Sequence, residues 1–341
     1  MKAYLDDRQR AHDPKHFMAN GVRVPNPEVP RRVDILKAGA EAAGGVFEEP
    51  DDAGPGPIAA VHTPEYLTFL RGIHARWRRI EGASEEVIPN VHPMSRADSY
   101  PTSAVGQAGF HQADTACPIA AHTWKAAYWS AQTAIAGADA VAGGARAVYA
   151  LCRPPGHHAF ADLAGGFCFL NNSGIAAERL LRRGLRPAIL DIDVHHGNGT
   201  QGMFHARGDV LTVSIHVDPA RFYPFFWGHA HERGAGAGLG ANLNLPLERG
   251  TGDAAYLAAL DRGLERIADF GADVVVVAVG LDAHVDDPFK GLAVTTDGFT
   301  RIGDAIAGLS RPCLCVQEGG YVSDALGDNL TAFLGGIGAG G

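Results

Sequence analysis

Five apolar runs in the second half of the chain restrict its fold more than any other feature. The runs are rich in Val, Ile and Leu and show little polar alternation, which is typical of strands that helices cover on both faces. They lie at 146–152, 187–193, 209–217, 273–282 and 312–320. Segments with helical spacing lie between them, at 172–184, 253–271 and 296–309. This alternation predicts an α/β domain with a doubly wound parallel sheet.

One stretch does not fit this alternation. Residues 81–122 carry few periodic signals, several prolines and scattered aromatic residues. A long segment without regular structure in a compact domain usually has a function. We therefore interpret it as an irregular insertion in a single domain of residues 1–341, and we expect a further loop at 50–60.

Composition and charge exclude several classes of protein. Hydrophobic residues make up 46% of the chain and charged residues 20%, which suits a globular core. There is no run of eighteen apolar residues and no signal-peptide core at the N-terminus, so we expect no membrane span and a cytoplasmic location. The net charge of −9 offers no basic patch for nucleic acid. The five cysteines, an odd number, are expected to be reduced structural thiols.

Polar side chains gather directly after four of the predicted strands. They are His157 and His158, then Asp191, Asp193, His195, His196 and Asn198, then Asp282, and finally Glu318 and Tyr321. In open α/β sheets, ligands bind beyond the carboxyl ends of the strands. Taken singly, Asp282 is typical of a helix cap, Tyr321 of a turn and a His-His pair of a surface or core. The four clusters together favour one functional site.

The residue types at these strand ends suit a catalytic metal. Side chains alternate along a strand, so Asp191, Asp193 and His195 are expected to point the same way. Asp193 and His195 with Asp282 would leave the fourth position of a zinc ion open for water and substrate. The oxygen-rich set also permits Fe²⁺ or Co²⁺.

Six motifs carry a resemblance to a known family. "RPPGHH", "GFCFLNN", "DIDVHHGNGT", "VSIH", "GLDAHVDDP" and "EGGY" resemble the signatures of zinc-dependent deacetylases of the histone deacetylase superfamily, over about 15–335. The segments "GVRVPNPEVPRR" and 101–124 are closest to its bacterial acetylpolyamine amidohydrolase branch. The resemblance implies the arginase–deacetylase fold, with an eight-stranded parallel sheet and helices on both faces. It also implies hydrolysis of N-acetyl amides on small cationic amines.

The resemblance assigns a role to each polar residue of the site. Zn²⁺ would be held by Asp193, His195 and Asp282, and Tyr321 would donate to the oxyanion. His158 would be the general base and then the acid, while His157 would act electrostatically. Asp191 matches the partner of His157, and Asn198 matches the partner of His158. Because a carboxylate stabilises an imidazolium more than an amide does, we expect His158 to be the neutral histidine.

Further residues match the substrate tunnel and two cation sites of relatives. Phe167, beside Gly166, and Tyr223 match its aromatic walls, although both could be core aromatics. Phe289 stands where one polyamine-specific relative has a glutamate, so Asp114 and the net negative charge of the chain become the candidates for attracting a cationic substrate. By resemblance, one K⁺ would bind near Asp191, Asp193, His195, Ser214 and Ile215, and another near Phe204, Arg207 and Val210.

Three other functions remain to be weighed. The first is a lysine deacetylase of the same superfamily that acts on proteins or peptides. The insertion at 81–122 argues against it, because in the amidohydrolase branch such a segment makes a homodimer and narrows the entrance. The second is a binding protein without catalysis, which retention of every site residue disfavours. The third, a manganese ureohydrolase, needs a two-metal set of aspartates that "DIDVHHGNG" does not supply.

Overall fold

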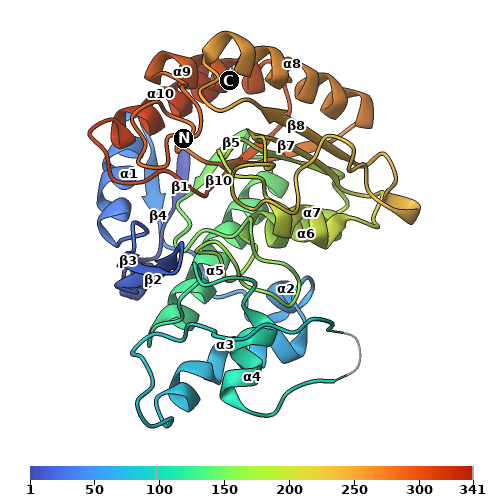
Figure 1. Cartoon of the computed structure of the whole chain (residues 1–341). Helices are drawn as coiled ribbons and strands as arrows, with labels where there is room; N and C mark the ends of the chain where they lie inside the picture. Colours follow the sequence, from blue (N-terminus) through green and yellow to red (C-terminus); the bar gives the residue numbers. More distant parts are fainter. Residues whose placement is uncertain (97–98, 340–341) are drawn as a thin grey trace.

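A parallel sheet of eight strands forms the centre of the computed structural model, which describes residues 1–96 and 99–339. The strand order is β4-β1-β5-β10-β9-β6-β7-β8 (Figure 1). The strands are β1 (Lys2–Tyr4), β4 (Val46–Glu48), β5 (Ala147–Ala150), β6 (Pro187–Asp191), β7 (Leu211–Val217), β8 (Asn242–Leu247), β9 (Val274–Val279) and β10 (Cys313–Gln317). The predicted eight-stranded parallel sheet is confirmed.

The five apolar runs became the strands β5, β6, β7, β9 and β10. Each strand is shorter than its predicted run. The register aligns Asp191, the last residue of β6, with Ala278 of β9 and Ser214 of β7. The carboxyl ends of these neighbouring strands therefore meet at one edge of the sheet.

Helices cover both faces of the sheet (Figure 1). One layer contains α1 (Arg31–Ala42), α8 (Asp253–Phe270), α9 (Thr296–Ala307) and α10 (Leu326–Ala339). The other contains α5 (Thr123–Ala142), α6 (Asn172–Arg182) and α7 (Asn198–Phe204). Helix α8 packs on β7 and β8, while α5 packs on β1, β5 and β10, so the apolar faces of the strands are buried on both sides.

The predicted helices begin and end where their capping residues allow. Helix α8 has Gly252 at its N-cap, and Gly271 ends it in the left-handed conformation at φ 70°. Helix α9 begins after Thr295, whose side chain accepts the N–H of Gly298 at 3.0 Å. All three helices expected between the strands are present.

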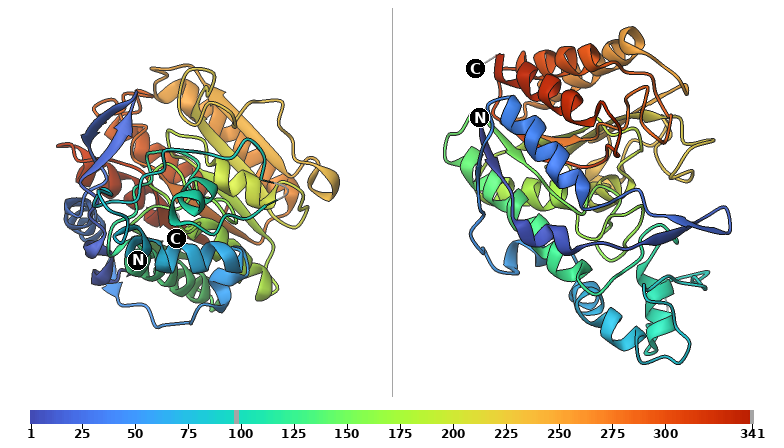
Figure 2. Two further views of the ribbon diagram at one scale, coloured as in Figure 1. Left: turned by 60° about the horizontal axis from the view of Figure 1, so that its bottom comes forward. Right: turned by 90° about the vertical axis from the view of Figure 1, so that its left-hand side faces the viewer.

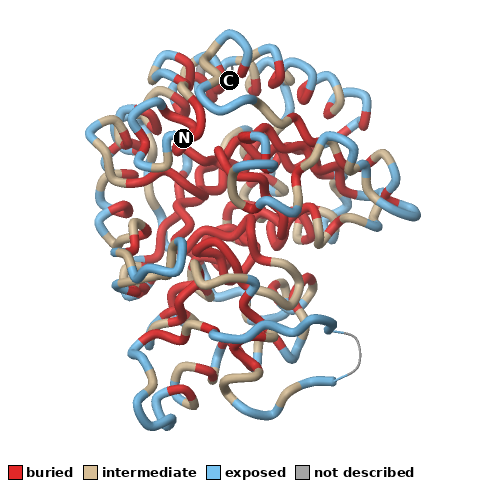
Figure 3. The backbone as a smooth tube through the Cα atoms, in the orientation of Figure 1, coloured by how far each residue is buried: buried red, intermediate tan, exposed pale blue. Residues whose placement is uncertain are grey.

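A smaller lobe lies against the amino-terminal part of α5 (Figures 1 and 3). It holds α2 (Gly56–Ala59), α3 (Pro64–Trp77), α4 (Ala104–His111) and the loops at 78–96 and 99–103. Tyr66, Phe69 and Ile73 of α3 pack in its buried core. Helix α4 lies inside the stretch predicted to be irregular, and α2 gives one helical turn to the predicted loop at 50–60. Both predictions therefore need correction at these two helices.

A two-stranded antiparallel hairpin, β2 (His16–Ala19) with β3 (Val22–Pro25), projects from the body (Figure 2). Its turn residues Asn20 and Gly21 have φ angles of 51° and 77°. Two short 3₁₀ helices, Asp7–Ala11 and Gly236–Gly238, complete the elements. All five cysteines are free and buried. Within the described residues no helix combines the length and apolar character needed to cross a membrane.

Candidate active site

The three predicted metal ligands lie together at the carboxyl edge of the sheet. Ligand atoms of Asp193, His195 and Asp282 are all within 4.8 Å of one another, and the three side chains are buried. His195 Nδ1 lies 3.1 Å from Asp193 Oδ1 and 3.4 Å from Asp282 Oδ2. Asp282 Oδ2 is buried and accepts no hydrogen bond from the described residues. Because such an unpaired oxygen is costly, this set fits a bound cation.

Backbone hydrogen bonds to the site's own carboxylates hold the segment that carries two of the ligands. Strand β6 ends at Asp191, so Asp193 and His195 lie in the loop that follows. In that loop Asp191 Oδ1 accepts the N–H of Asp193 at 3.1 Å, and Asp193 Oδ1 accepts the N–H of His195 at 2.9 Å. Asp282 Oδ1 accepts the N–H of Val194 at 3.0 Å. The carboxylates of the site therefore fix the backbone that carries them. Ile192 and Val194 still hydrogen bond to the neighbouring strands and pack in the apolar core, while the polar residues between them face the site, as alternation predicts.

Gly319 allows the metal-binding carboxylates to approach the next loop. Its N–H donates to Asp193 Oδ2 at 2.8 Å. A Cβ at this position would overlap Oδ2 of both Asp193 and Asp282. A side chain here would therefore displace two of the three candidate ligands.

The two adjacent histidines have different partners, as the sequence predicts. His157 Nδ1 donates to Asp191 Oδ2 at 2.9 Å, whereas His158 Nδ1 donates to Asn198 Oδ1 at 2.7 Å. Burial opposes charge on His157, but Asp191 and Asp193 outweigh it and raise its pKa to about 10. Burial, together with the nearby His157 and His195, lowers the pKa of His158 well below its usual value. His158 is thus the neutral histidine of the pair.

Tyr321 faces the same cavity from the loop after β10. Its ring lies 4.7 Å from that of Phe289 and 6.0 Å from that of Phe167. Its backbone N–H donates to Asp287 Oδ2 at 3.0 Å. No described residue hydrogen bonds with its hydroxyl, which is therefore available to a ligand.

A cavity of about 290 Å³ joins these groups to the surface. Its floor includes His157, His158, Asp193, His195 and Tyr321. All five residues predicted to bind substrate line it, namely Asp114, Gly166, Phe167, Tyr223 and Phe289. The rings of Tyr223 and His158 meet edge to face at 4.9 Å. Six aromatic side chains stand in the walls, so the cavity suits a slender apolar chain that ends at the polar floor.

Asp114 lies in the wall and is already hydrogen bonded within the chain. Its Oδ2 accepts the hydroxyl of Tyr223 at 2.6 Å and the N–H of Gly166 at 3.2 Å. Its Oδ1 accepts the N–H of Ala116 at 2.7 Å. Gly166 has φ +48°, and a Cβ there would come within 2.5 Å of His158 Cδ2. Asp114 thus holds two wall residues in place, in addition to any attraction it exerts on a cation.

Sequence reasoning missed one wall of the cavity. The β2–β3 hairpin contributes Phe17, Met18, Ala19 and Asn20 to the lining. The ring of Phe17 meets that of Phe167 edge to face at 5.3 Å. The Asn20-Gly21 pair between two short apolar stretches is a strong hairpin signal, and it could have been recognised.

Sequence reasoning also missed a buried ion cluster behind the site. Glu28 Oε1 accepts hydrogen bonds from Arg32 at 2.7 Å and from Arg153 at 2.9 Å, and all three side chains are at most 1% exposed. Arg32 also donates to the carbonyls of Glu318 at 2.7 Å and Gly320 at 2.6 Å. The cluster therefore supports the loop of Tyr321 from behind. The sequence "PNPEVPRR" does not indicate that its Glu28 is paired with the distant Arg153.

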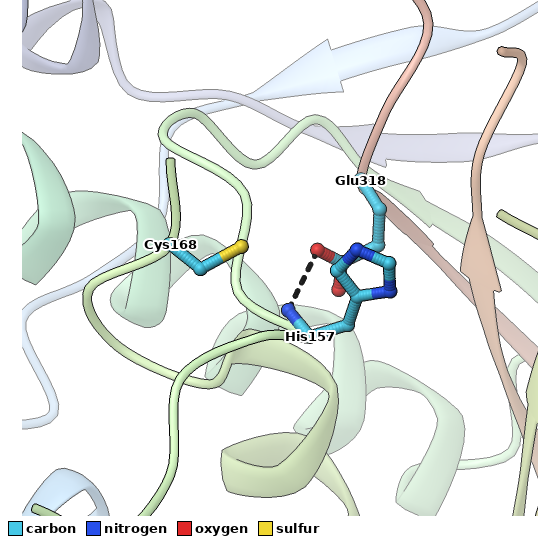
Figure 4. Close-up of side chains that lie close together, drawn as sticks. All are labelled: His157, Cys168 and Glu318. Atoms are coloured by element: carbon cyan, nitrogen blue, oxygen red, sulfur yellow. Dashed lines mark hydrogen bonds between the residues drawn. The ribbon is translucent and has the colours of Figure 1, made fainter. Parts of the chain in front are cut away.

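A second group of buried donor atoms adjoins the histidine pair (Figure 4). His157, Cys168 and Glu318 each offer one ligand atom within 4.8 Å of the others. However, His157 Nδ1 is bonded to Asp191, and Glu318 Oε2 accepts two backbone N–H groups. We assign the metal to the first group, whose Asp282 has the unpaired oxygen.

The residues predicted for K⁺ lie near the turns behind the site. Ser214 of β7 is paired with Asp191 of β6, and Ile215 follows it in the strand. In the second group the N–H of Arg207 donates to the carbonyl of Phe204 at 2.9 Å, and Val210 directly precedes β7. Both K⁺ sites remain predictions.

Comparisons with known proteins agree on one family. A model of the histone deacetylase domain matches residues 26–337. An acetylpolyamine amidohydrolase of Burkholderia pseudomallei is 48% identical over 99% of both chains. Acetylpolyamine amidohydrolase 1 of Pseudomonas aeruginosa is 42% identical over 98% of this chain and 97% of its own. A crystal structure of the acetylpolyamine aminohydrolase from Burkholderia pseudomallei superposes with a TM-score of 0.97 over 99% of both chains, at 48% identity.

Proposed function

The chain belongs to the histone deacetylase family, and from this premise we propose that it hydrolyses the N-acetyl amides of small cationic amines such as acetylpolyamines. The products are acetate and the free amine. The observation that carries the proposal is the meeting of a metal-ligand group, a neutral histidine and a tyrosine hydroxyl on the floor of one aromatic cavity. Relatives of this name that match the full length support the choice of substrate.

We propose that the metal is a single Zn²⁺ held by Asp193, His195 and Asp282. Two carboxylates and one imidazole fit a catalytic zinc site with an open position. The unpaired Oδ2 of buried Asp282 supports this assignment. When bound, such an ion would polarise the amide carbonyl and lower the pKa of a water molecule.

His158 moves the proton in the proposed reaction. Its Nδ1 donates to Asn198, so Nε2 keeps a free lone pair that can accept a proton from the attacking water. The C–N bond then breaks, and His158 returns the proton to the leaving nitrogen. His157 is held in the imidazolium form by Asp191, so it stabilises negative charge without giving up its proton.

Tyr321 supplies the hydrogen bond to the oxyanion. Its hydroxyl faces the cavity and has no partner among the described residues, so no existing bond must break when the amide becomes tetrahedral. A donor that is oriented before the reaction is worth more than a water molecule that must reorient.

The cavity supports a slender substrate with a distal ammonium group. Aromatic rings line the path to the floor, and their faces attract cations as well as apolar stems. Asp114 adds one carboxylate near the entrance. A carboxylate–ammonium contact at an exposed site contributes only about 0–1 kcal/mol. The shape of the tunnel should therefore supply most of the selection against bulky proteins.

Purified zinc-loaded protein would be assayed against N-acetylputrescine, N-acetylcadaverine and an acetyl-lysine peptide. We expect kcat/KM to be higher for the acetylated diamines, and His158→Ala, loaded with the same metal, controls for contaminating hydrolases. A higher value for the peptide would identify a lysine deacetylase instead. Absence of acetate release from all three would refute the proposed function.

We further propose a homodimer in the cytoplasm that binds K⁺. Five free buried cysteines suit a reducing compartment. Val91 and Met94 of the insertion, and Phe226 next to the cavity-lining Phe225, are exposed apolar side chains that a subunit interface would bury. Light scattering would test the dimer, with a monomer as the contrary result. Replacing K⁺ by choline in the assay would test the cation sites.

A further inference from the structure

Glu318 is a buried acid beside the site, and the proposed mechanism gives it no role. It follows β10 directly and begins the sequence "EGGY" that carries Tyr321. Its side chain is 0% exposed. Burying a carboxylate is costly unless its oxygens are hydrogen bonded, so its contacts explain why it is tolerated.

The carboxylate of Glu318 reaches across to the loop of the two histidines. Its Oε2 accepts the backbone N–H of Gly156 at 2.6 Å and that of His157 at 3.0 Å, and Figure 4 shows the second of these bonds. Its Oε1 accepts the hydroxyl of Ser173 in the first turn of α6 at 2.9 Å. One side chain therefore holds the backbone on which His157 and His158 are mounted.

Hydrogen bonds also hold the backbone of Glu318 in place. Its N–H donates to the carbonyl of Val279 at 2.8 Å, and its carbonyl accepts from Arg32 at 2.7 Å. The next residue donates to Asp193, and the N–H of Tyr321 donates to Asp287. The turn that carries Tyr321 is thus anchored to the strand ends that hold the metal ligands.

Two catalytic segments, 154–158 and 317–321, are joined here. Within the described residues, one side chain makes direct hydrogen bonds from one segment to the other. This is Glu318, which accepts the N–H groups of Gly156 and His157. His158 and Tyr321 must both contact the same acetamide group, so the distance between them has to be fixed before the substrate binds. A shift of about 1 Å in such a pair can cost about 10²-fold in rate.

We infer that Glu318 is a positioning residue that fixes the histidine loop against the tyrosine loop, and that it does so by hydrogen-bond reach rather than by charge. The inference rests on the proposed deacetylation, because only that reaction needs His158 and Tyr321 on one substrate. The rival explanation is electrostatic, since a negative charge beside His157 would favour its imidazolium form.

Two variants separate these explanations. Glu318→Gln removes the charge but keeps the length: the amide oxygen can accept both N–H groups, and the NH₂ group can donate to the Ser173 hydroxyl. Glu318→Asp keeps the charge but shortens the side chain by one methylene, which withdraws the acceptor from Gly156 and His157. The matched control is Asp253→Asn, which alters a carboxylate that also accepts a backbone N–H and a hydroxyl, both from Thr295.

Each variant would be assayed for kcat and KM on N-acetylputrescine, with metal content measured on the same sample. We expect kcat within about threefold of wild type for Glu318→Gln and for the control. For Glu318→Asp we expect a fall of about 10²-fold in kcat with KM and metal content little changed. Amide hydrogen exchange at Gly156 and His157 should quicken in Glu318→Asp and stay slow in Glu318→Gln, which tests the lost bonds without reference to activity.

If Glu318→Asp kept its kcat and Glu318→Gln lost it, the inference would be overturned, because the negative charge and not the reach of the side chain would then be what matters. Wild-type kcat and unchanged exchange in both variants would show that the link has no function. A wild-type protein that prefers the acetyl-lysine peptide would refute the proposed substrate, yet the order of the two variants could still be read on that peptide. A wild-type protein inactive on every acetylated amine would refute both proposals.

Discussion

Removing the hydroxyl oxygen of Tyr321 should lower the catalytic rate but leave the stability of the protein unchanged. In Tyr321→Phe the ring keeps its neighbours, the rings of Phe289 at 4.7 Å and Phe167 at 6.0 Å. The hydroxyl that is lost has no hydrogen-bond partner among the described residues, so folding should lose no bond. The N–H of residue 321 keeps its bond to Asp287. The substitution should therefore leave the melting temperature unchanged.

The expected loss in rate follows from the role of that hydroxyl. Deleting one preorganised oxyanion donor typically lowers kcat by about 10²–10³-fold, which is about 2.7–4 kcal/mol of transition-state stabilisation. Because the bond forms as charge develops on the oxygen, KM should change little. The assay is acetate release from N-acetylputrescine under saturating conditions, with metal content and thermal unfolding measured on the same preparation.

Tyr66→Phe is the matched control, with the opposite expected result. The hydroxyl of buried Tyr66 donates to the carbonyl of Phe169 at 2.6 Å, and Tyr66 takes no part in the proposed reaction. Its removal leaves that carbonyl unsatisfied and should cost about 1–3 kcal/mol of stability while kcat stays near wild type. A kcat for Tyr321→Phe within tenfold of wild type would refute the oxyanion role. A lower melting temperature for Tyr321→Phe would refute the argument that its hydroxyl is free.

Four further results are expected. Asp282→Ala should lose metal together with activity, because a three-ligand site cannot spare an anion; normal zinc stoichiometry in this variant would contradict the ligand set. His158→Ala should keep its metal but lose about 10²–10⁴-fold in kcat, and retention of a tenth of wild-type kcat would assign the base elsewhere. Asp114→Ala should lower kcat/KM for N-acetylputrescine and neutral N-butylacetamide alike, because Tyr223 loses its partner; a selective loss of more than about fivefold for the cationic substrate would make charge the main role. Burial lowers the pKa of His62 to about 4, and burial with a nearby arginine lowers that of His12 to about 3, so below about pH 6.5 the unfolded chain binds protons at these two positions that the native state does not. These two histidines should therefore make the protein less stable to urea as the pH falls from 7 to 5; an unchanged pH dependence after both are replaced by glutamine would contradict this.

Sequence patterns predicted those parts of the fold in which a local signal is strong. The run "DVVVVAVGLD" is uniformly apolar, and β9 formed within it. By contrast, β1 and β4 have three residues each, too few for any periodicity to show. They become strands because β5 offers an edge to β1, and β1 then offers one to β4. Such pairing is a property of the tertiary structure.

In the site, too, the sequence predicted the residue types but not all of their contacts. The types of residue that follow the strands predicted a metal group, and Asp193, His195 and Asp282 do lie together. The regular strand ends at Asp191, but Ile192 and Val194 still hydrogen bond to the neighbouring strands, so the predicted alternation extends to the ligands. The bond of Glu28 to Arg32 spans four residues, a common spacing for ion pairs, but its bond to Arg153 spans 125 residues and no spacing rule connects these two positions.

The place of β10 in the sheet has a consequence for how the protein is made. This strand is the last of the described strands to leave the ribosome, yet it lies fourth in the sheet, between β5 and β9. Until it emerges, the nascent chain can form only two partial sheets, and the valine-rich edge of β9 remains open to other chains. Tyr321 follows four residues after β10. Closing the seam of the sheet and placing Tyr321 therefore depend on the same strand, and a chain that stops before β10 should lack activity and leave the edge of β9 exposed.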